Sequence, residues 1–234
     1  METLFEDERL RITFEPGTEH DKAIVAFAGF ALGFGGIQRE EFAGTLSDAS
    51  ISHDVYYVVE KARSLFNETF ETIRTVLDPR LPLGQTYLLG NSAGGYGALL
   101  FDTVFAARKS TIAFVPTFSV RPNGLIYDPR FRDHIEKIAT WRFDHVPKSN
   151  GSRRFIFFGD RDTNDLPHLA HFRAFEDPNA QIYCVSGCGH DVAMYLQIVY
   201  RALRPIIDII VNHDASHDDV SALLQKFGIP VTIT

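Results

Sequence analysis

The feature that most constrains the fold of this chain is a serine flanked by glycines, between an apolar run and a run of small residues. The apolar run is Thr86–Leu89, and Gly90 and Gly94 bracket Ser92 in a Gly-x-Ser-x-Gly pattern. A chain that turns sharply from a strand into a helix needs glycine where the two elements approach each other, because glycine has no Cβ. The stretch therefore predicts a buried strand, a tight turn at Ser92 and a helix.

Short apolar runs alternate with longer helical stretches on both sides of this motif. Such alternation is typical of an α/β fold, a mostly parallel central sheet flanked by helices. We expect buried strands at 23–28, 55–59, 86–89, 111–115, 154–158 and 181–185, and helices at 64–77, 94–107, 166–175 and 191–211. The period-two alternation of 9–15 predicts an antiparallel edge strand, and 229–234 predicts an extra strand after a short helix.

No repeat, low-complexity tract or linker divides the 234 residues, so we expect a single domain spanning 1–234. The least regular region, 121–152, is polar and contains three prolines and the only tryptophan. We interpret it as a possible small cap or insertion over the carboxyl edge of the sheet.

Composition narrows the class of protein. The net charge of −7 argues against a nucleic-acid partner, which would favour a basic surface. The only cysteines, Cys184 and Cys188, lie close together and do not form a disulfide framework, which favours a reducing compartment. The acidic start lacks the features of a signal peptide, and no stretch is apolar enough to span a membrane. We therefore expect a soluble cytoplasmic protein.

The segment Gly90-Asn91-Ser92-Ala93-Gly94, in its strand-to-helix setting, resembles the nucleophile elbow of the α/β-hydrolase superfamily. The resemblance implies an α/β-hydrolase fold with a small or minimal cap and a serine esterase that needs no cofactor. It also implies that Ser92 is the nucleophile, followed along the chain by an acid and then a histidine. A serine hydroxyl is a weak nucleophile, so a nearby base has to activate it.

Candidates for the acid follow the strand 154–158. The superfamily's usual Gly-x-x-Asp arrangement, counted from Gly159, implies that Asp162 is the triad acid. Asp160 and Asp165 stay open as alternatives. Each of these aspartates could also be a turn former or a helix N-cap, because a predicted helix follows.

The candidate histidine is His190, which closes the sequence Gly187-Cys188-Gly189-His190 after the last predicted core strand. This loop resembles the catalytic histidine loop of the superfamily. His190 follows Ser92 and Asp162 in the required order, with room for a helix and a strand after Asp162. We expect it to be the general base.

An oxyanion hole needs two fixed N–H donors. The resemblance implies that the backbone N–H of Ala93 is one of them, and that the other belongs to Gly29 or Phe30, after the strand 23–28. We favour Phe30 slightly. Aromatic residues expected to line the substrate pocket are Tyr96, Phe34 and Phe118.

Other ligand classes find little support in the sequence. The glycine-rich run 29–36 has Gln38 where a dinucleotide-binding pattern needs its third glycine. The histidine pairs at 168 and 171 and at 213 and 217 have no convincing third ligand, so no metal site is predicted.

These observations predict a serine hydrolase that cleaves a carboxylic ester or thioester through Ser92, His190 and Asp162, with an acyl-enzyme intermediate. The short interval between nucleophile and acid favours an open site for a small-molecule or glycan-linked acyl ester. An acyltransferase using the same triad and a non-catalytic binding or assembly protein are the alternatives. The terminal strand 229–234 could also pair with a second copy in a homodimer.

Overall fold

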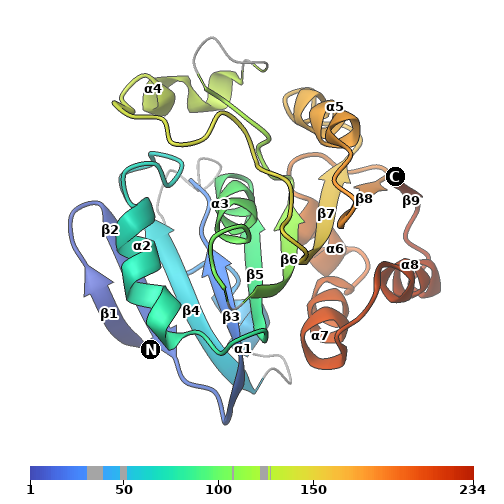
Figure 1. Ribbon diagram of the computed structural model, residues 1–234. Helices are drawn as coiled ribbons and strands as arrows, with labels where there is room; N and C mark the ends of the chain where they lie inside the picture. Colours follow the sequence, from blue (N-terminus) through green and yellow to red (C-terminus); the bar gives the residue numbers. More distant parts are fainter. Residues whose placement is uncertain (31–38, 48–51, 107, 122–125, 127) are drawn as a thin grey trace.

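The structure is a computed structural model that describes residues 1–30, 39–47, 52–106, 108–121, 126 and 128–234 (Figure 1). Its described part is built on one nine-stranded sheet in the order β1-β2-β4-β3-β5-β6-β7-β8-β9. The strands are β1 (Glu2–Glu6), β2 (Leu10–Glu15), β3 (Glu19–Phe27), β4 (His53–Glu60), β5 (Thr86–Asn91), β6 (Arg108–Phe114), β7 (Arg153–Gly159), β8 (Ala180–Val185) and β9 (Val231–Ile233).

The central strands of this sheet run parallel. The pairs β4–β3, β3–β5, β5–β6, β6–β7 and β7–β8 are all parallel, whereas β1–β2, β2–β4 and β8–β9 are antiparallel. The mostly parallel α/β fold, the six buried strands and the terminal strand are thus confirmed. The strand at 9–15 is antiparallel as predicted, but it is not at the edge, because the N-terminal residues add β1 outside it.

Helices of the described residues connect and flank the strands. They are α1 (Ala43–Ser47), α2 (Phe70–Leu77), α3 (Ala93–Phe101), α4 (Arg132–Ile135), α5 (Asp165–Phe175), α6 (Val192–Ile198), α7 (Leu203–His213) and α8 (His217–Lys226), with the 3-10 turns η2 (Asp78–Arg80) and η3 (Pro129–Phe131). None of the helices in the described part of the chain is long and apolar enough to cross a membrane.

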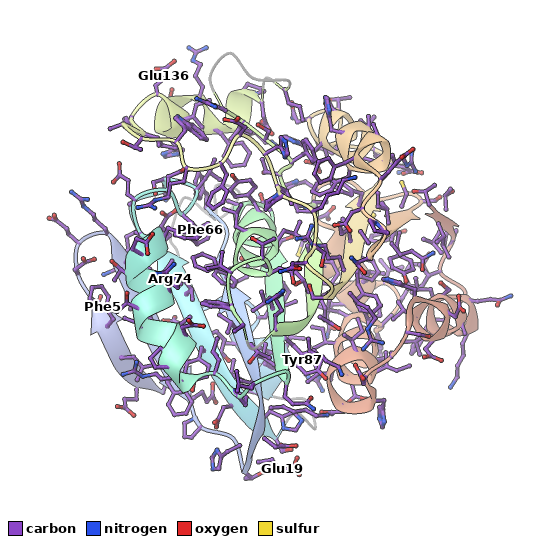
Figure 2. The ribbon with its side chains drawn as sticks, in the orientation of Figure 1. Phe5, Glu19, Phe66, Arg74, Tyr87 and Glu136 are labelled. Atoms are coloured by element: carbon purple, nitrogen blue, oxygen red, sulfur yellow. The ribbon has the colours of Figure 1, made fainter. Side chains whose placement is uncertain are left out.

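Burial on both faces of the sheet explains why the strands appear in the sequence as continuous apolar runs. The side chains of Phe155–Phe158 are at most 1% exposed, although successive residues of a strand point to opposite faces. Both faces of β7 are therefore covered, as expected for a parallel sheet between helices. On one face, α2 and α3 pack through the rings of Phe70 and Phe101, whose centroids are 4.9 Å apart, and Figure 2 shows Phe66 in the same layer.

The helix predicted at 64–77 begins only at Phe70 because a buried carboxylate organises the residues before it. Glu60 accepts hydrogen bonds from the hydroxyl groups of Ser64 and Thr69 and from the N–H of Phe66. Burial raises the pKa of Glu60, and these donors counter that effect. The backbone of Phe66 has a φ of 62°, which is incompatible with a right-handed helix.

The predicted helix 191–211 is two helices, α6 and α7. Arg201, between them, has a φ of 54°. Pro205 lies in the first turn of α7, where its missing N–H is tolerated, whereas it would remove a hydrogen bond from the middle of a continuous helix. The break allows α6 and α7 to pack against each other.

The irregular region after β6 contains η3 and α4 and lies beyond the carboxyl ends of the central strands (Figure 1). Its Phe131 ring packs against Phe30, with centroids 5.4 Å apart. This contact connects the region to the loop after β3, and the neighbouring Arg130 lies beside His190.

Candidate active site

Ser92 occupies a sharp turn between β5 and α3. Its backbone has φ 56° and ψ −121°, a conformation that residues other than glycine adopt rarely. The turn is held on both sides, because the Ser92 N–H donates to the carbonyl of Phe114 (2.8 Å) and the Ser92 carbonyl accepts from Tyr96 N–H (3.0 Å). A strained serine at the carboxyl end of a parallel strand is the geometry of a nucleophile elbow.

The two glycines of the motif are required sterically. A Cβ on Gly90 would lie 2.2 Å from the carbonyl oxygen of Gly94, and one on Gly94 would lie 2.1 Å from the carbonyl oxygen of Phe27. Both obstacles are backbone atoms, so no side-chain movement could relieve the clash. The structure thus supplies the close approach that the sequence pattern predicted.

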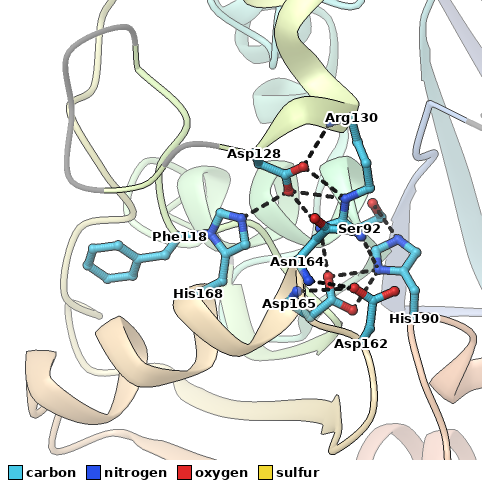
Figure 3. Close-up of polar contacts among 9 residues, drawn as sticks. All are labelled: Ser92, Phe118, Asp128, Arg130, Asp162, Asn164, Asp165, His168 and His190. Carbon is cyan, nitrogen blue, oxygen red and sulfur yellow. Dashed lines mark hydrogen bonds and ion pairs between the residues drawn. The ribbon is translucent and has the colours of Figure 1, made fainter.

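His190, in the loop between β8 and α6, connects Ser92 to a carboxylate (Figure 3). Its Nε2 lies 3.0 Å from Ser92 Oγ, and its Nδ1 lies 2.8 Å from Oδ2 of Asp165. Gly159 allows this loop to approach β7, since a Cβ there would lie 2.4 Å from the carbonyl oxygens of Cys188 and Gly189. The serine, the imidazole and an aspartate therefore form one continuous chain of contacts.

The aspartate in this chain is Asp165, not the expected Asp162. A carboxylate oxygen of Asp162 lies within 4.8 Å of a His190 nitrogen, but no hydrogen bond joins the two. The Oδ1 of Asp162 instead accepts the backbone N–H groups of Asn164 (2.8 Å) and Asp165 (3.3 Å). The remaining alternative, Asp160, accepts the N–H of Gly187 (2.8 Å). Asp165 is the first residue of α5 and is 1% exposed, so the start of the helix turns its side chain towards the histidine.

Arg130 is a site residue whose contacts the sequence did not reveal. It lies on η3, and its Nη2 donates to Asp165 Oδ1 (2.7 Å) and to Asp128 Oδ2 (2.6 Å). Its Nη1 lies 2.9 Å from Nδ1 of His190 (Figure 3). In the sequence Arg130 is one of several arginines in the irregular region, and no local pattern separates it from a solvent-exposed charge.

Asp128 anchors Arg130 from behind. The Asp128 side chain is fully buried and also faces Nε2 of His168 (3.2 Å). The N–H of Phe118 donates to His168 Nδ1 (3.0 Å), so a neutral His168 carries its proton on Nε2 and donates it to Asp128. Burial alone would raise the pKa of Asp128, but the hydrogen bonds from His168 and Arg130 and the Arg130 charge hold it well below its ordinary value.

Two opposite partners meet at Nδ1 of His190. Arg130 can only donate a hydrogen bond and the Asp165 carboxylate can only accept one, so a neutral imidazole can satisfy one of them at a time. With the proton on Nδ1, Asp165 is satisfied and Nε2 is a base towards Ser92. With the proton on Nε2, Arg130 is satisfied and Ser92 faces an N–H. Asp165 thus favours the tautomer that can activate the serine.

The backbone N–H groups predicted to form the oxyanion hole differ in whether they already donate a hydrogen bond within the protein. Ala93 is the first residue of α3, where backbone N–H groups have no acceptor within the helix. Gly29 lies beside Ser92, since a Cβ on it would be 3.7 Å from Ser92 Cβ, but its N–H donates to Oε2 of Glu41 (2.7 Å). Of the two predicted donors after β3, Gly29 thus has its N–H engaged with Glu41.

Glu41 is a second residue that the sequence did not suggest. Its Oε1 accepts a hydrogen bond from the Asn91 side chain (3.1 Å), so the carboxylate joins the loop after β3 to the end of β5. Burial raises the pKa of Glu41, although the Gly29 and Asn91 donors and the nearby His190 oppose the effect. Glu41 thus fixes the loop beside Ser92.

The expected pocket residues are mostly buried in the core. Tyr96 is 2% exposed, and burial raises the pKa of its hydroxyl group. Phe118 is 3% exposed and packs against rings that include His171 and Phe172, and in Figure 3 it points away from Ser92. Both rings are buried in the interior, so neither side chain is accessible to a ligand from the surface. Phe34 lies outside the described residues.

Comparison with solved structures finds proteins of similar fold whose sequences are less than 20% identical to this chain. The capsule O-acetyltransferase of Neisseria meningitidis serogroup A is similar with a TM-score of 0.59 and 19% identity, over 89% of this chain and 93% of that one. Est1E from Butyrivibrio proteoclasticus has a TM-score of 0.58 and 16% identity, over 88% and 96%. Thermogutta terrifontis esterase 2 phosphoramylated by tabun has a TM-score of 0.58 and 13% identity, over 88% and 90%.

No protein-family model matches the sequence, and no curated protein matches it significantly. The structural matches cover most of both chains, and this likeness in fold accords with the mostly parallel nine-stranded sheet. The chain has the α/β-hydrolase fold.

Proposed function

We propose that the protein is a serine hydrolase that cleaves a carboxylic ester or thioester through Ser92, His190 and Asp165. The observation that carries the proposal is the continuous chain from Ser92 Oγ to His190 Nε2 (3.0 Å) and from Nδ1 to Asp165 (2.8 Å), at a strained strand-to-helix turn. Such a chain is what activation of a weak hydroxyl nucleophile requires.

The mechanism follows from the tautomer that Asp165 favours. Nε2 of His190 removes the proton of Ser92 as Oγ attacks the substrate carbonyl, and Asp165 stabilises the imidazolium that forms. His190 then protonates the leaving alcohol or thiol, and an acyl-enzyme remains. Water activated by the same imidazole hydrolyses this intermediate and regenerates Ser92.

The oxyanion hole in this proposal consists of the N–H groups of Ala93 and Phe30. Ala93 contributes the first-turn donor of α3, and the partial positive charge of the helix N-terminus adds to it. The Gly29 N–H donates to Glu41 instead, and this hydrogen bond fixes Gly29, the residue before Phe30, beside the serine turn.

The substrate class we propose is a small-molecule or glycan-linked acyl ester. The region around η3 and α4 would act as a small cap of a single domain, since Arg130 and Phe131 contact His190 and Phe30 respectively. A cytoplasmic location and a homodimer through the terminal strand β9 belong to the same proposal. They are tested by fractionation and by gel filtration of a chain ending at Phe227.

A second candidate function is acyl transfer to an acceptor other than water. It is favoured by the similarity to a capsule O-acetyltransferase, which is matched over most of both chains. Both reactions share the acyl-enzyme and differ only in what resolves it. Adding a carbohydrate or simple alcohol acceptor during turnover separates them, because an acyltransferase diverts the acyl group to the acceptor and a hydrolase releases free acid.

Turnover of p-nitrophenyl acetate tests the proposal. Ser92→Ala should abolish the reaction while Ser221→Ala, on α8, should leave it unchanged. The two variants should have the same circular dichroism spectrum as the unmodified protein. Hydrolysis that survives in Ser92→Ala would show that the serine chain is not the catalyst.

A further inference from the structure

A second cluster of polar side chains lies at the amino-terminal ends of the parallel strands, opposite the carboxyl ends where Ser92 lies. Ser92 follows the carboxyl end of β5, whereas Glu19 and Asp21 lie at the start of β3 and His53 is the first residue of β4. Glu19 and His53 are register partners in the sheet. Figure 2 shows Glu19 at the bottom of the molecule and Glu136, in the region beyond the carboxyl ends, at the top.

The orientation of His53 is fixed by a chain of hydrogen bonds from α7. The amide nitrogen of Asn212 donates to Asp208 Oδ1 (2.7 Å), which leaves Asn212 Oδ1 facing Nε2 of His53 (3.0 Å). An amide oxygen only accepts hydrogen bonds, so Nε2 has to be the donor. In the neutral ring, the lone pair is therefore on Nδ1. His53 is only 5% exposed, so the ring cannot turn away.

Nδ1 of His53 points at two carboxylates without a hydrogen bond to either. It lies 3.6 Å from Oε2 of Glu19 and 3.7 Å from Oδ1 of Asp21, which is too long for a hydrogen bond. Nδ1 is buried and has no hydrogen-bond partner within the described residues. In the neutral ring, the lone pair on Nδ1 and the two anionic oxygens lie within 4.8 Å of one another and repel. A metal ion between them removes this repulsion, as would a proton on Nδ1.

The spacing of these three atoms fits a metal ion. Ligand atoms on a tetrahedral Zn²⁺ at about 2.0–2.1 Å lie about 3.4 Å from one another. The two separations from Nδ1 are within a few tenths of an ångström of that value, and the exposed carboxylates of Glu19 (61%) and Asp21 (70%) can adjust. The Nε2–H to Asn212 contact is the second hydrogen bond that metal-binding histidines usually make.

The surroundings leave room for the ion. A surface hollow of about 240 Å³ is lined by Glu19, Asp21, Lys22, Ser52, His53 and Asn212. A water molecule takes about 30 Å³ in the liquid, so an ion and several waters fit. The ammonium group of Lys22 is directed to the carbonyl oxygens of Val211 (2.9 Å) and Asn212 (3.2 Å), at the end of α7.

We propose that Glu19, Asp21 and His53 bind a divalent transition metal ion of the zinc type, with water as the fourth ligand. One imidazole and two carboxylates form a donor set that suits Zn²⁺. The ion would tie the starts of β3 and β4 to each other and, through Asn212, to α7. Because the site lies at the amino-terminal ends of the strands and Ser92 at the carboxyl ends, the ion stabilises the fold and takes no part in the chemistry at Ser92.

Zinc titration of the full chain, first stripped of metal with a chelator, tests the proposal. Calorimetry should show one high-affinity ion per chain, and Tm should rise by roughly 5–10 °C at a free Zn²⁺ concentration about a hundredfold above Kd. Co²⁺ should give the visible absorption of a four-coordinate ion. Esterase activity should be the same with and without the ion, so this outcome is independent of the proposed function.

Paired variants assign the binding to these residues. Glu19→Gln and Asp21→Asn change exposed side chains, so both proteins should fold, and each should lose the stabilisation by Zn²⁺. His20→Gln is the matched control, because His20 lies between them and contacts Asp54 instead. The proposal is overturned if no ion binds, or if binding and the rise in Tm persist unchanged in Glu19→Gln and Asp21→Asn.

Discussion

Replacing Asp165 with asparagine should inactivate the enzyme while leaving it folded. The carboxylate is 2.8 Å from His190 Nδ1 and is the contact that favours a proton there. An amide is uncharged and can itself donate to Nδ1, and Arg130 Nη1, 2.9 Å from the same atom, then has no carboxylate competing with it at Nδ1. Both effects move the proton to Nε2, so Ser92 loses its base.

The expected loss can be stated as a number. In serine proteases, the equivalent change of aspartate to asparagine lowers kcat about 10⁴-fold, which corresponds to about 5.4 kcal/mol of lost transition-state stabilisation. We expect a loss of this order in Asp165→Asn. KM should change little, because Asp165 is 1% exposed and does not face the substrate.

Asp162→Asn is the matched control. Its Oδ1 accepts the Asn164 N–H (2.8 Å), and an asparagine oxygen can accept the same hydrogen bond. We expect kcat within about tenfold of the unmodified enzyme, since less than about 1.4 kcal/mol is involved. The assay is p-nitrophenyl acetate hydrolysis with thermal denaturation of each protein. Asp165 is not the triad acid if Asp162→Asn loses as much activity as Asp165→Asn, or if Asp165→Asn keeps a tenth or more of the unmodified enzyme's kcat.

Three further predictions concern the fold around the site. Gly94→Ala should fail to fold or lose activity, because its Cβ would lie 2.1 Å from the Phe27 carbonyl oxygen, whereas Gly44→Ala, with nothing within 4 Å, should be neutral in thermal denaturation. Arg130→Met should lower the free energy of unfolding by about 3–5 kcal/mol, because it leaves the buried Asp128 carboxylate without its cation. Adding Asp128→Asn should recover part of this loss in urea titrations. Because the pKa of Asp128 is depressed in the folded state, its stabilisation is complete above its unfolded pKa of about 3.9 and is lost as pH falls towards its folded pKa. Asp128→Asn should therefore flatten the acid limb of the stability curve.

The sequence predicted the elements that depend on local pattern. Runs such as 155–158 are apolar on both faces because the sheet is covered on both sides, and this leaves a clear trace in the sequence. The serine turn was predictable for a similar reason, because Gly90 and Gly94 each avoid a backbone clash. His190 could be placed by its glycine-flanked loop after a strand.

The acid could not be chosen from spacing alone. The side chain of Asp162 accepts a backbone N–H at the turn before α5. The carboxylate in contact with His190 is that of Asp165, three residues later. Two aspartates three residues apart before a helix were a usable signal, since one of them is expected to serve as the cap. The sequence does not show which one does so.

The contacts of Arg130 and Glu41 depend on tertiary structure. Arg130 is far in sequence from both Asp165 and His190, and Glu41 is far from Asn91, so no local pattern connects them. The break between α6 and α7 was easier to predict from the sequence, because Pro205 fits only the first turn of a helix.

The most direct test of the central claim is labelling with a fluorophosphonate probe, followed by mass spectrometry of the peptides. The account predicts one adduct per chain, located on Ser92, and a labelling rate that falls sharply in His190→Ala and in Asp165→Asn. No adduct on Ser92, or equally fast labelling in those two variants, would contradict it.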